Sequence, residues 1–562
     1  MRTRHTHPFP AAQLSRRRFV QGMAGSAVLL ASRHALSLDA NETDRSVLTG
    51  PDFDLTIGEV TVDYTGRKRT ATAVNGQVPG PLLSMREGDA VTIRVTNRLP
   101  VRTSIHWHGF ILPADMDGVP GLSFPGIDPG STFLYRFRVN QSGSYWYHSH
   151  SRFQEQTGLY GPIVIEPRRG ERHGSDREYI ILLSDWSDAD PEWLYATLKR
   201  RSDYFNFGKR TVGDFIADVQ AHGFREIVAE RSAWGQIRMD PTDLLDVGGA
   251  TYTYLLNGVA PAGNWTGLFK RGERIRLRFI NGSSMSFFDV RIPGLPLTVV
   301  AADGQDVEPV TVDEFRIGAA EVLDVMVSPS TEQAYTIFAQ SMDRSGYARG
   351  TLAPEPGMTA AVAPLDGRVP LTLGDVGMAD DMAGMHDMAG MHHADSAQFG
   401  PTVDMEAMHS ASRLDDPGPG FRGNGRRVLT YADLHTLGGP IEQRDAARDI
   451  ELHLTGHMER FIWSFNGQKF SEAAPLRFAF GERLRIVLVN DSMMTHPIHL
   501  HGMWSELEAD DGAFLVRKHT VSVQPAQRLS YLVTADALGR WAYHCHLIYH
   551  MEAGMFREVV VA

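Results

Sequence analysis

Residues 543–555 read Tyr-His-Cys-His-Leu-Ile-Tyr-His-Met-Glu-Ala-Gly-Met, and they contain Cys545, the single cysteine of the 562-residue chain. A lone cysteine flanked by histidines has no disulfide partner in its own chain, and soft sulfur beside imidazole favours copper. Three further histidine clusters precede this stretch: His106-Trp107-His108, His148-Ser149-His150 and His496-Pro497-Ile498-His499-Leu500-His501. Together the clusters offer ten histidines, one thiolate and the Met555 thioether, a set that suits more than one metal ion.

The spacing of these clusters predicts their geometry. In a β-strand, residues i and i+2 point to one face, while residue i+1 points to the other. Each His-x-His pair therefore presents two imidazoles on one face, and four converging pairs supply eight ligands, enough for a cluster of three copper ions. Cys545 points the opposite way and is expected to bind a separate copper ion. Its backbone joins directly to His544 and His546, which gives a short covalent route for electrons.

The separate site is completed by residues on the same side as Cys545. His496 and His550 give a two-histidine, one-cysteine set, with Met555 as the weak axial ligand of a blue-copper centre. His496 is three residues before His499, and this odd spacing in a strand points it to the face opposite His499, the side of Cys545. Pro497 is nevertheless expected to interrupt a regular strand. A single His-x-His is often only polar surface, and a histidine-rich run can be a nonspecific metal trap. Four ordered clusters followed by Cys, His and Met favour a specific site.

The chain also contains an internal repeat. Three segments resemble one another, and each alternates in part between apolar and charged or polar residues, as strands do. The three copies are residues 88–97, 272–281 and 481–490. An Asn-Gly turn precedes each copy, at Asn75, Asn257 and Asn466. The sequence therefore predicts three copies of one β-domain.

The copies differ at the positions where metal would bind. In the first and third copies a His-x-His pair begins nine residues after the last Asn of the repeat, at His106 and His499. In the second copy the same offsets hold Val290 and Ile292, and the segment 334–339 stands in place of the later pair without a histidine. We therefore expect the first and third copies to share a metal cluster at their mutual interface, with the second copy as a spacer.

These motifs and repeats resemble the three-domain multicopper oxidases, and most closely the copper-resistance protein CopA group. The most specific motif is the stretch 544–555, and the resemblance covers nearly the whole chain after the first 40 residues. It implies an all-β fold of three cupredoxin-like Greek-key β-sandwiches. The implied domains are residues 45–168, 175–365 without copper ligands, and 426–562 with the type 1 copper.

The resemblance also implies four copper ions, namely one type 1, one type 2 and a type 3 pair. By position, the type 1 ligands are His496, Cys545, His550 and Met555. The type 2 ligands are His106 and His499. The type 3 ligands are His108, His148, His150, His501, His544 and His546.

The implied activity couples oxidation of a reducing substrate to reduction of dioxygen to water, with Cys545 and its neighbouring histidines as the electron route. Oxygen reduction consumes protons, so a carboxylate near the cluster is expected. Asp117 resembles by position the acidic residue that follows the first His-x-His-Gly in the family. An ordinary Asp-Gly turn residue is the alternative interpretation. Glu552 is another candidate acid. Met551, directly after His550, stands where some cuprous oxidases have an acid, and this difference argues against a direct copy of their proton route.

The first 40 residues resemble a twin-arginine signal peptide. The motif Ser-Arg-Arg-Arg-Phe-Val at 15–20 precedes an apolar stretch at 22–31 that is too short and too rich in Gly and Ala for a stable membrane span. A disordered basic tail is the alternative. We expect export to the periplasm by the twin-arginine machinery. The net charge of −12 argues against nucleic-acid binding and favours attraction of cations.

A Met/His-rich segment lies within the expected linker at 366–425. Thioethers suit Cu(I), and spacings of three and four residues can place methionines along one helical face. The candidates for Cu(I) binding are Met378, Met382, Met385, His386, Met388, Met391, His392 and His393, followed by Met405, Met408 and His409. Three interpretations stay open: a flexible linker or a helix over apolar surface, a segment that gathers Cu(I) for the type 1 site, and a docking site for a protein partner.

Three functions are consistent with the sequence. The first is a periplasmic cuprous oxidase for copper tolerance, which converts Cu(I) to Cu(II) and accounts for the Met/His-rich segment. The second is a laccase-like oxidase of small phenols or aromatic amines, which shares every copper ligand but which a methionine segment over the type 1 site would hinder. The third is a copper-sequestering binding protein, against which the complete ligand set argues.

Overall fold

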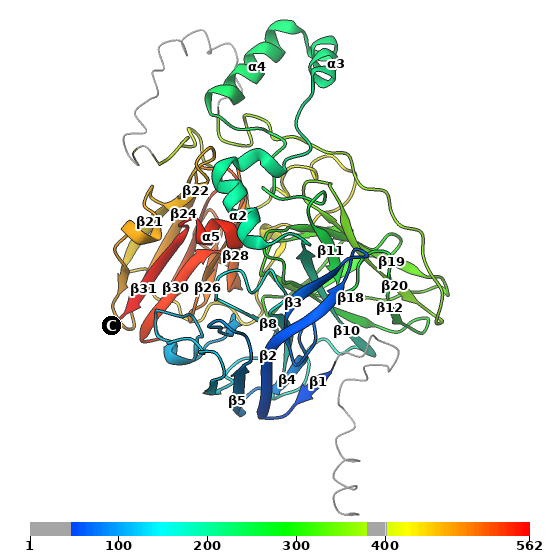
Figure 1. Ribbon diagram of the computed structural model, residues 1–562, viewed down its shortest axis with the longest axis vertical. Helices are drawn as coiled ribbons and strands as arrows, with labels where there is room; N and C mark the ends of the chain where they lie inside the picture. Colours follow the sequence, from blue (N-terminus) through cyan, green and yellow to red (C-terminus); the bar gives the residue numbers. More distant parts are fainter. Residues whose placement is uncertain (1–45, 379–399, 401) are drawn as a thin grey trace, which may run out of the picture. The chain divides into compact units, whose positions relative to one another are not determined.

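The computed structural model describes residues 46–378, 400 and 402–562. In that part of the chain six β-sheets form three pairs, so the predicted all-β fold of three cupredoxin-like domains is confirmed (Figure 1). The proposed signal peptide at 1–40 lies outside the described residues, and so do seven Cu(I) candidates, Met382, Met385, His386, Met388, Met391, His392 and His393. Among the described residues, no helix is both long and apolar enough to cross a membrane.

The first domain pairs a five-stranded and a four-stranded sheet. The larger sheet has the order β1 (Val47–Thr49), β4 (Leu82–Arg86), β9 (Tyr160–Glu166), β8 (Gly143–His148) and β6 (His106–His108). The smaller has the order β3 (Lys68–Val74), β2 (Asp52–Asp63), β5 (Ala90–Asn97) and β7 (Thr132–Arg138). The 3-10 helix η1 (Ala114–Met116) follows β6. Strands β6 and β8 thus carry the first two histidine clusters side by side.

The second domain pairs a six-stranded and a five-stranded sheet. One has the order β11 (Thr253–Leu256), β10 (Arg177–Trp186), β13 (Ile275–Asn281), β18 (Val322–Val327), β15 (Leu297–Ala302) and β16 (Gln305–Val312). The other has the order β12 (Trp265–Leu268), β20 (Tyr347–Ala353), β19 (Tyr335–Ser341), β14 (Phe288–Arg291) and β17 (Glu314–Ile317).

The third domain repeats the six-plus-five arrangement. Its larger sheet has the order β22 (Ile462–Phe465), β21 (Arg448–His457), β24 (Arg483–Asn490), β29 (Arg528–Thr534), β26 (Ser505–Glu508) and β27 (Phe514–Lys518). The other has the order β23 (Leu476–Phe478), β31 (Phe556–Val561), β30 (Gly539–Cys545), β25 (His496–Leu500) and β28 (Thr520–Val523). The short helix α5 (Ile548–Glu552) follows β30, and the 3-10 turns η5 (Tyr431–Asp433) and η6 (Phe470–Glu472) lie in loops.

The internal repeat corresponds to one structural unit in each domain. Strands β5, β13 and β24 each pair in parallel with an earlier strand, β2, β10 and β21 respectively. Each repeat ends in a buried asparagine: Asn97, Asn281 or Asn490. In every copy the side-chain NH₂ donates to two backbone carbonyls at 2.8–3.0 Å. The side-chain oxygen accepts from the backbone N–H two residues later, so one asparagine fixes the chain that leaves the strand.

The Asn-Gly turns are equally alike. Asn75, Asn257 and Asn466 have φ values of 53°, 55° and 50°, and a positive-φ glycine follows each of them. Consecutive positive φ angles define the tight type I′ hairpin turn, for which Asn-Gly is the preferred sequence. The Asn side-chain oxygens accept from the backbone N–H groups of an adjacent strand at 2.7–2.9 Å. Local chemistry therefore specifies the same turn in all three domains.

Strand pairing also explains why the second domain lacks a metal cluster. His106 lies opposite His148 on β8, and His499 lies opposite His544 on β30. The corresponding pair in the second domain is Val290 opposite Ala339. The register is thus the same in all three copies, but only the first and third present imidazoles there.

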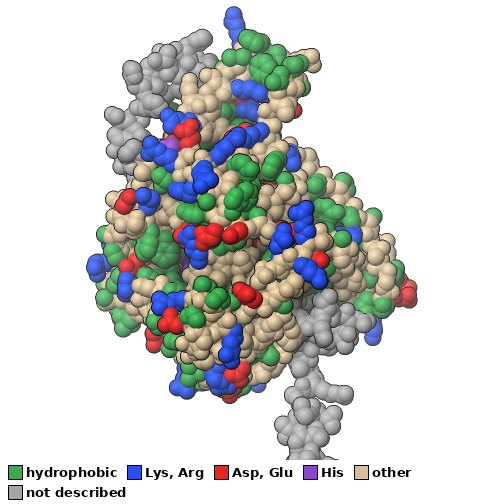
Figure 2. Space-filling model, in the orientation of Figure 1, with side chains coloured by type: hydrophobic (Ala, Val, Ile, Leu, Met, Phe, Trp, Pro, Cys, Tyr) green, Lys and Arg blue, Asp and Glu red, His purple; other side chains and the backbone are tan. Residues whose placement is uncertain are grey.

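The second domain carries a helical insertion between β10 and β11. It consists of α2 (Pro191–Arg200), η2 (Ser202–Phe205), α3 (Val212–His222) and α4 (Phe224–Gln236). Trp234 on α4 is buried, whereas Val212, Ile216 and Phe224 are exposed, so hydrophobic side chains gather on the surface of the α3–α4 hairpin (Figure 2). Arg238, just after α4, forms an ion pair with Glu459 of the third domain at 3.1 Å.

The described ends of the Met/His-rich segment touch the folded core. Met378 is half-buried against the main hydrophobic cluster, and Met405 is buried within it. Met408 and His409 are exposed. The backbone N–H of His409 donates to the carbonyl of Gly377 at 3.0 Å, which holds the two ends of the segment together.

Candidate metal centre

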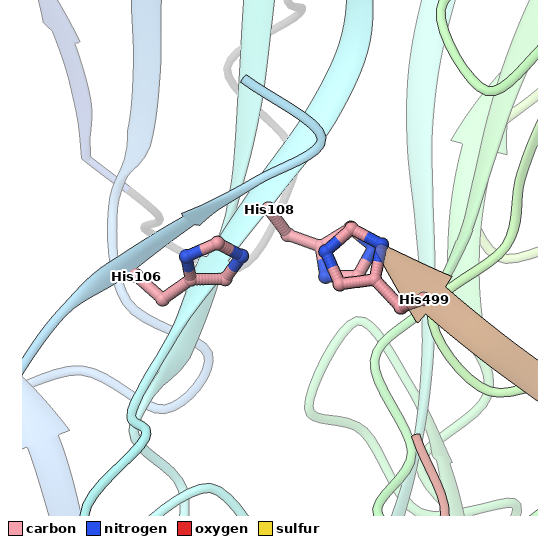
Figure 3. Close-up of side chains that lie close together, drawn as sticks. All are labelled: His106, His108 and His499. Atoms are coloured by element: carbon pink, nitrogen blue, oxygen red, sulfur yellow. The ribbon is translucent and has the colours of Figure 1, made fainter. Parts of the chain in front are cut away.

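Eight histidines from the first and third domains converge at one buried position. They come from β6, from β8 and the residues after it, from β25 and His501, and from β30 and His546. The rings of His108 and His499 stack with centroids 3.9 Å apart, and Figure 3 shows the two imidazoles overlapping with His106 beside them. The His106 and His501 rings lie 4.0 Å apart. The structure thus brings together all four predicted His-x-His pairs.

The two domains meet with approximate two-fold symmetry. His106 and His499 occupy matching positions in their domains, as do His108 and His501, so the 4.0 Å and 3.9 Å ring contacts are equivalent. The same holds for the later clusters, where His148 and His546 lie 4.9 Å apart and His150 and His544 lie 5.0 Å apart. Two copies of one β-domain therefore build the cluster by facing each other.

Several of these histidines stand close enough to share a metal ion. The ring nitrogens in each group lie within 4.8 Å of one another. The groups are His108 with His148 and His546, His106 with His150 and His501, and His106 with His108 and His499. The Nε2 atoms of His501 and His544 lie 3.1 Å apart. The overlap of the groups fits a cluster of adjacent ions better than one isolated ion.

The outer ring nitrogens are held by the backbone. Nδ1 of His106 donates to the Asp117 carbonyl at 2.8 Å, Nδ1 of His499 to the His519 carbonyl, and Nδ1 of His544 to the Cys545 carbonyl. Among the described residues, the inner Nε2 atoms of His106 and His499 have no hydrogen-bond partner although they are buried. Buried nitrogen without a partner is costly unless it binds something, so the donor set fits metal.

The protonation of the histidines suits this role. Burial lowers the pKa of His108, His148, His501 and His546 well below the usual value, and neighbouring imidazoles lower it further. The rings are therefore neutral near pH 7, and a neutral imidazole has the lone pair that binds a metal.

Two carboxylates touch this cluster. Asp117 Oδ2 accepts from Nδ1 of His501 at 2.9 Å, so the predicted candidate acid does lie at the cluster. Asp117 also ends η1 and precedes Gly118 at φ 83°, so it is a turn residue as well. Glu155 Oε2 lies 2.5 Å from Nδ1 of His148. The sequence analysis missed Glu155, because no metal-ligand spacing connects it to the histidines. Glu552, the other candidate acid, pairs instead with Arg152.

A second group forms on the opposite side of β30. The Sγ atom of Cys545 lies 3.5 Å from Nδ1 of His496 and 3.8 Å from Nδ1 of His550. All three side chains are fully buried. Met555 is also buried, and its carbonyl accepts from the Cys545 N–H at 3.1 Å. The predicted parity of His496 is confirmed, but Pro497 does not interrupt the strand, because its carbonyl still accepts from the His546 N–H at 2.7 Å.

Neighbouring side chains hold the two histidines of this second group in place. Nε2 of His496 lies 2.7 Å from the Ser492 hydroxyl, and Nε2 of His550 lies 2.6 Å from Asp246 Oδ2. The Trp463 ring stacks on His550 at 4.0 Å. Burial raises the pKa of the Cys545 thiol, so its thiolate needs a bound cation. Ser492, Asp246 and Trp463 carry no sequence signal for this role, since each comes from a separate loop or strand.

A cavity of about 210 Å³ lies beside Asp246. Three carboxylates, those of Asp243, Asp246 and Asp343, belong to its lining. Exposed Phe207 and Val369 also line it, so the cavity reaches the surface. Arg368 is the one cationic side chain in this lining, and the cavity reaches Asp246, whose carboxylate contacts His550 of the Cys545 group.

Comparison with known proteins identifies the family. Family models described as multicopper oxidase match residues 56–170, 177–363 and 443–562. The chain therefore belongs to the multicopper oxidases, which are oxidoreductases that use dioxygen and a reductant. It is 57% identical to a copper resistance protein A homolog of Pseudomonas syringae pv. tomato, over 97% of this chain and 99% of that one. It is 55% identical to copper resistance protein A of Escherichia coli, over 97% and 99%. The predicted resemblance to the CopA type is confirmed.

Solved structures confirm the fold. Fet3p, described as a multicopper oxidase that functions in iron import, superposes with a TM-score of 0.65 at 20% identity, over 92% of this chain and 90% of that one. The laccase from Botrytis aclada superposes with a TM-score of 0.63 at 21% identity, over 92% and 88%.

Proposed function

We propose that the protein is a periplasmic cuprous oxidase of copper resistance, which oxidises Cu(I) to Cu(II) and reduces dioxygen to water. The names of its relatives support the role in copper resistance. The proposal includes the domain boundaries given above, export through residues 1–40 by the twin-arginine machinery, and delivery of Cu(I) by the Met/His-rich segment.

The proposed ligand roles are those implied by the family resemblance. His496, Cys545, His550 and Met555 hold the type 1 ion, His106 and His499 the type 2 ion, and the remaining six histidines the type 3 pair. When bound, the ions supply one-electron redox chemistry and a place for dioxygen. The protein supplies the covalent path, since Cys545 lies between His544 and His546 in the chain. All the proposed ligands except the partly exposed His150 are buried, which limits the access of bulk water.

The acidic cavity beside His550 is the observation that carries the choice of substrate. Burial and the neighbouring Asp246 raise the pKa of Asp243, and burial raises the pKa of Asp246 to about 8. Two buried carboxylates that repel each other are stabilised by a cation between them. The three carboxylates of the lining outnumber its one cationic side chain, Arg368, and this balance of charge favours a metal cation over a phenol.

Oxygen uptake by the copper-loaded protein tests the proposal. Chelated Cu(I) and a simple methoxyphenol are each supplied in large excess over protein. The proposal requires many turnovers with Cu(I) and few with the phenol. Fast turnover with the phenol alone would assign a laccase-like oxidase, and uptake that stops after one filling of the copper sites would leave a copper-sequestering protein.

The Asp243→Asn variant tests the cavity itself. Asp243 lines the cavity without touching a proposed ligand, so the blue absorption should stay unchanged while the KM for Cu(I) rises about tenfold, the effect of losing roughly 1.4 kcal/mol of attraction. The matched control is Asp445→Asn, an exposed carboxylate of the third domain outside the cavity. Equal KM values in the two variants would place the Cu(I) site elsewhere.

A further inference from the structure

Glu155 is a buried carboxyl group outside the proposed ligand set. Its side chain is 4% exposed, and Oε2 lies 2.5 Å from Nδ1 of His148, which is itself 1% exposed. Nδ1 of His148 also lies 3.2 Å from the Ser149 carbonyl, but the carboxyl oxygen is nearer. Among the described residues, Oε1 of Glu155 has no hydrogen-bond partner. A buried acid is seldom placed against a histidine without a reason in binding or catalysis.

The loop that carries Glu155 is anchored on both sides. The Gln154 side chain accepts from the Thr103 hydroxyl at 2.6 Å and donates to the Arg102 carbonyl at 3.0 Å. On the other side, the Gln156 side chain accepts from Tyr549 at 2.5 Å and donates to Tyr252 at 3.2 Å. These bonds tie the loop to all three domains, so Glu155 is held in place rather than drawn in by His148 alone.

The ring of His148 is consequently fixed from three directions. Trp146 stacks on it with centroids 4.3 Å apart and an interplanar angle of 16°. Glu155 holds Nδ1, and Nε2 faces Nε2 of His546 at 3.4 Å. His148 belongs with His108 and His546 to one of the groups that can hold a metal ion. The Ser149 carbonyl and the Glu155 carboxyl both face Nδ1, so Nε2 is the nitrogen turned toward that group.

Comparison across the two-fold symmetry shows that the carboxyl contact is an addition. His544 is the third-domain counterpart of His148, and its Nδ1 donates to the carbonyl of the next residue, Cys545, at 2.9 Å, as Nδ1 of His148 does to the Ser149 carbonyl at 3.2 Å. On the other half of the cluster, Asp117 makes the equivalent carboxylate contact to His501 at 2.9 Å. Two of the six proposed type 3 ligands, His148 and His501, are thus each in contact with a carboxyl oxygen, and the two acids come from different loops.

We propose that Glu155 is a positioning residue of the trinuclear centre, which accepts the Nδ1 proton of His148 and so presents Nε2 as the ligand atom. The inference rests on the proposed type 3 role of His148. A carboxylate behind a metal-binding histidine fixes its tautomer and orientation, and loss of such a partner typically lowers metal affinity about 10–100-fold. The contact requires an acceptor oxygen and not a charge, which separates it from a role in proton transfer.

Three variants test this assignment. Glu155→Leu has similar size and no acceptor, and Glu155→Ala repeats the loss without the branched side chain in case the leucine variant does not fold. Glu155→Gln keeps an acceptor oxygen. The matched control is Thr157→Val, which removes the hydroxyl contacts to Thr72 and Gln154 in the same loop without touching a histidine. Copper per chain, the blue absorption and the fraction of copper visible by electron paramagnetic resonance are measured for each purified, copper-loaded protein.

We expect the leucine and alanine variants to keep the blue absorption of the Cys545 site and to bind copper about 10–100-fold more weakly at the other sites. The fraction of copper visible by resonance should rise in both, because a coupled pair of Cu(II) ions is silent and an uncoupled ion is not. The glutamine and control variants should match the wild-type protein. Unchanged copper content and spectra in the leucine and alanine variants, or an equal loss in the control, would overturn the assignment. A wild-type protein without a silent pair would instead refute the proposed copper sites.

Discussion

The side chain of Cys545 shows how strand geometry separates the two proposed metal centres by a single residue. Its Sγ atom lies 3.5 Å from Nδ1 of His496 on one face of β30, while His544 and His546 reach the cluster on the other face. No side chain has to move for the two sites to communicate, because the backbone itself joins them. Because of this alternation, one cysteine is enough to place a thiolate at one proposed site while its two neighbours reach the other. A shift of register in β30 would therefore disrupt both proposed sites at once.

Asp117 offers the clearest single-residue prediction for oxygen reduction. The Asp117→Asn variant keeps an oxygen that can accept from His501 but loses the acid, so we expect oxygen consumption to fall about 10²–10⁴-fold. Copper content and blue absorption should remain at wild-type values, because no proposed ligand changes. Steady-state oxygen uptake with saturating Cu(I), alongside metal analysis of the same sample, measures both. An undiminished rate would leave Asp117 with its role as a turn residue alone.

At the scale of the element, the buried asparagine after β5, β13 and β24 is what makes the three domains alike. Asn281 tests its contribution in the domain without proposed copper ligands. Asn281→Ala removes three hydrogen bonds and leaves the carbonyls of Ser286 and Ile317 and the N–H of Ser283 unpaired. We expect a loss of about 3–5 kcal/mol in the free energy of unfolding. Guanidinium unfolding monitored by tryptophan fluorescence measures it.

The control for this prediction is Thr298→Ala on β15 of the same domain. This variant breaks the exposed hydroxyl contact between Thr298 and Thr311. An exposed substitution of this kind should lower the free energy of unfolding by less than about 0.5 kcal/mol. If the two variants unfold at the same denaturant concentration, the asparagine is dispensable. The blue absorption of both variants should match the wild-type protein before unfolding.

The elements also show what the sequence could and could not predict. Period-two alternation and Asn-Gly turns are local, so the strands, the three-fold repeat and the convergence of the His-x-His pairs could be predicted. Asp246 could not, because it is 304 residues from His550 and reaches it only through the packing of two domains. His519 could not be predicted for the same reason, since it is 411 residues from His108, whereas Glu155 is near His148 in the chain but at a spacing typical of no metal site. The His-x-His pairs lie on strands or directly after them, where the period of two can be read, whereas Asp246 and Glu155 come from segments without such a period.

At the scale of the whole molecule, the second domain acts on the metal sites through its interface with the third. Lys518 at the end of β27 is buried and pairs with Asp303 at 3.0 Å and with Glu321 at 3.1 Å, both from the second domain. Asp303 also accepts from the backbone N–H of His519 at 3.1 Å. The His519 carbonyl accepts from Nδ1 of His499. Nδ1 of the His519 ring lies 3.1 Å from Nε2 of His108. A domain without proposed ligands thereby holds two proposed ligands, His499 and His108, in place.

This interface gives a prediction for the Lys518→Met variant, which leaves Asp303 and Glu321 buried without their cation. Breaking one partner of a buried ion pair costs about 3–5 kcal/mol, so the thermal midpoint should fall by roughly 5–15 °C. The matched control is Arg238→Met, which removes an exposed ion pair between the same two domains and should cost less than about 1 kcal/mol. Calorimetry of both variants and of the wild-type protein provides the comparison, and equal midpoints in the two variants would contradict it.

The pH dependence of the same comparison follows from the shifted pKa values. Burial opposes ionisation of Asp303, but nearby His519 and Lys518 outweigh it and lower the pKa below 3.8. For Lys518, burial is outweighed by Asp303 and Glu321, which raise the pKa above 10.5.

A lowered acid pKa contributes stability that is complete above the unfolded value and is lost as pH falls through the folded value. A raised lysine pKa contributes stability that is complete below the unfolded value and is lost as pH rises through the folded value. The wild-type advantage over Lys518→Met should therefore stay constant between about pH 5 and pH 9 and shrink in stronger acid. A difference that instead varied steadily across neutral pH would show that another titrating group controls the interface.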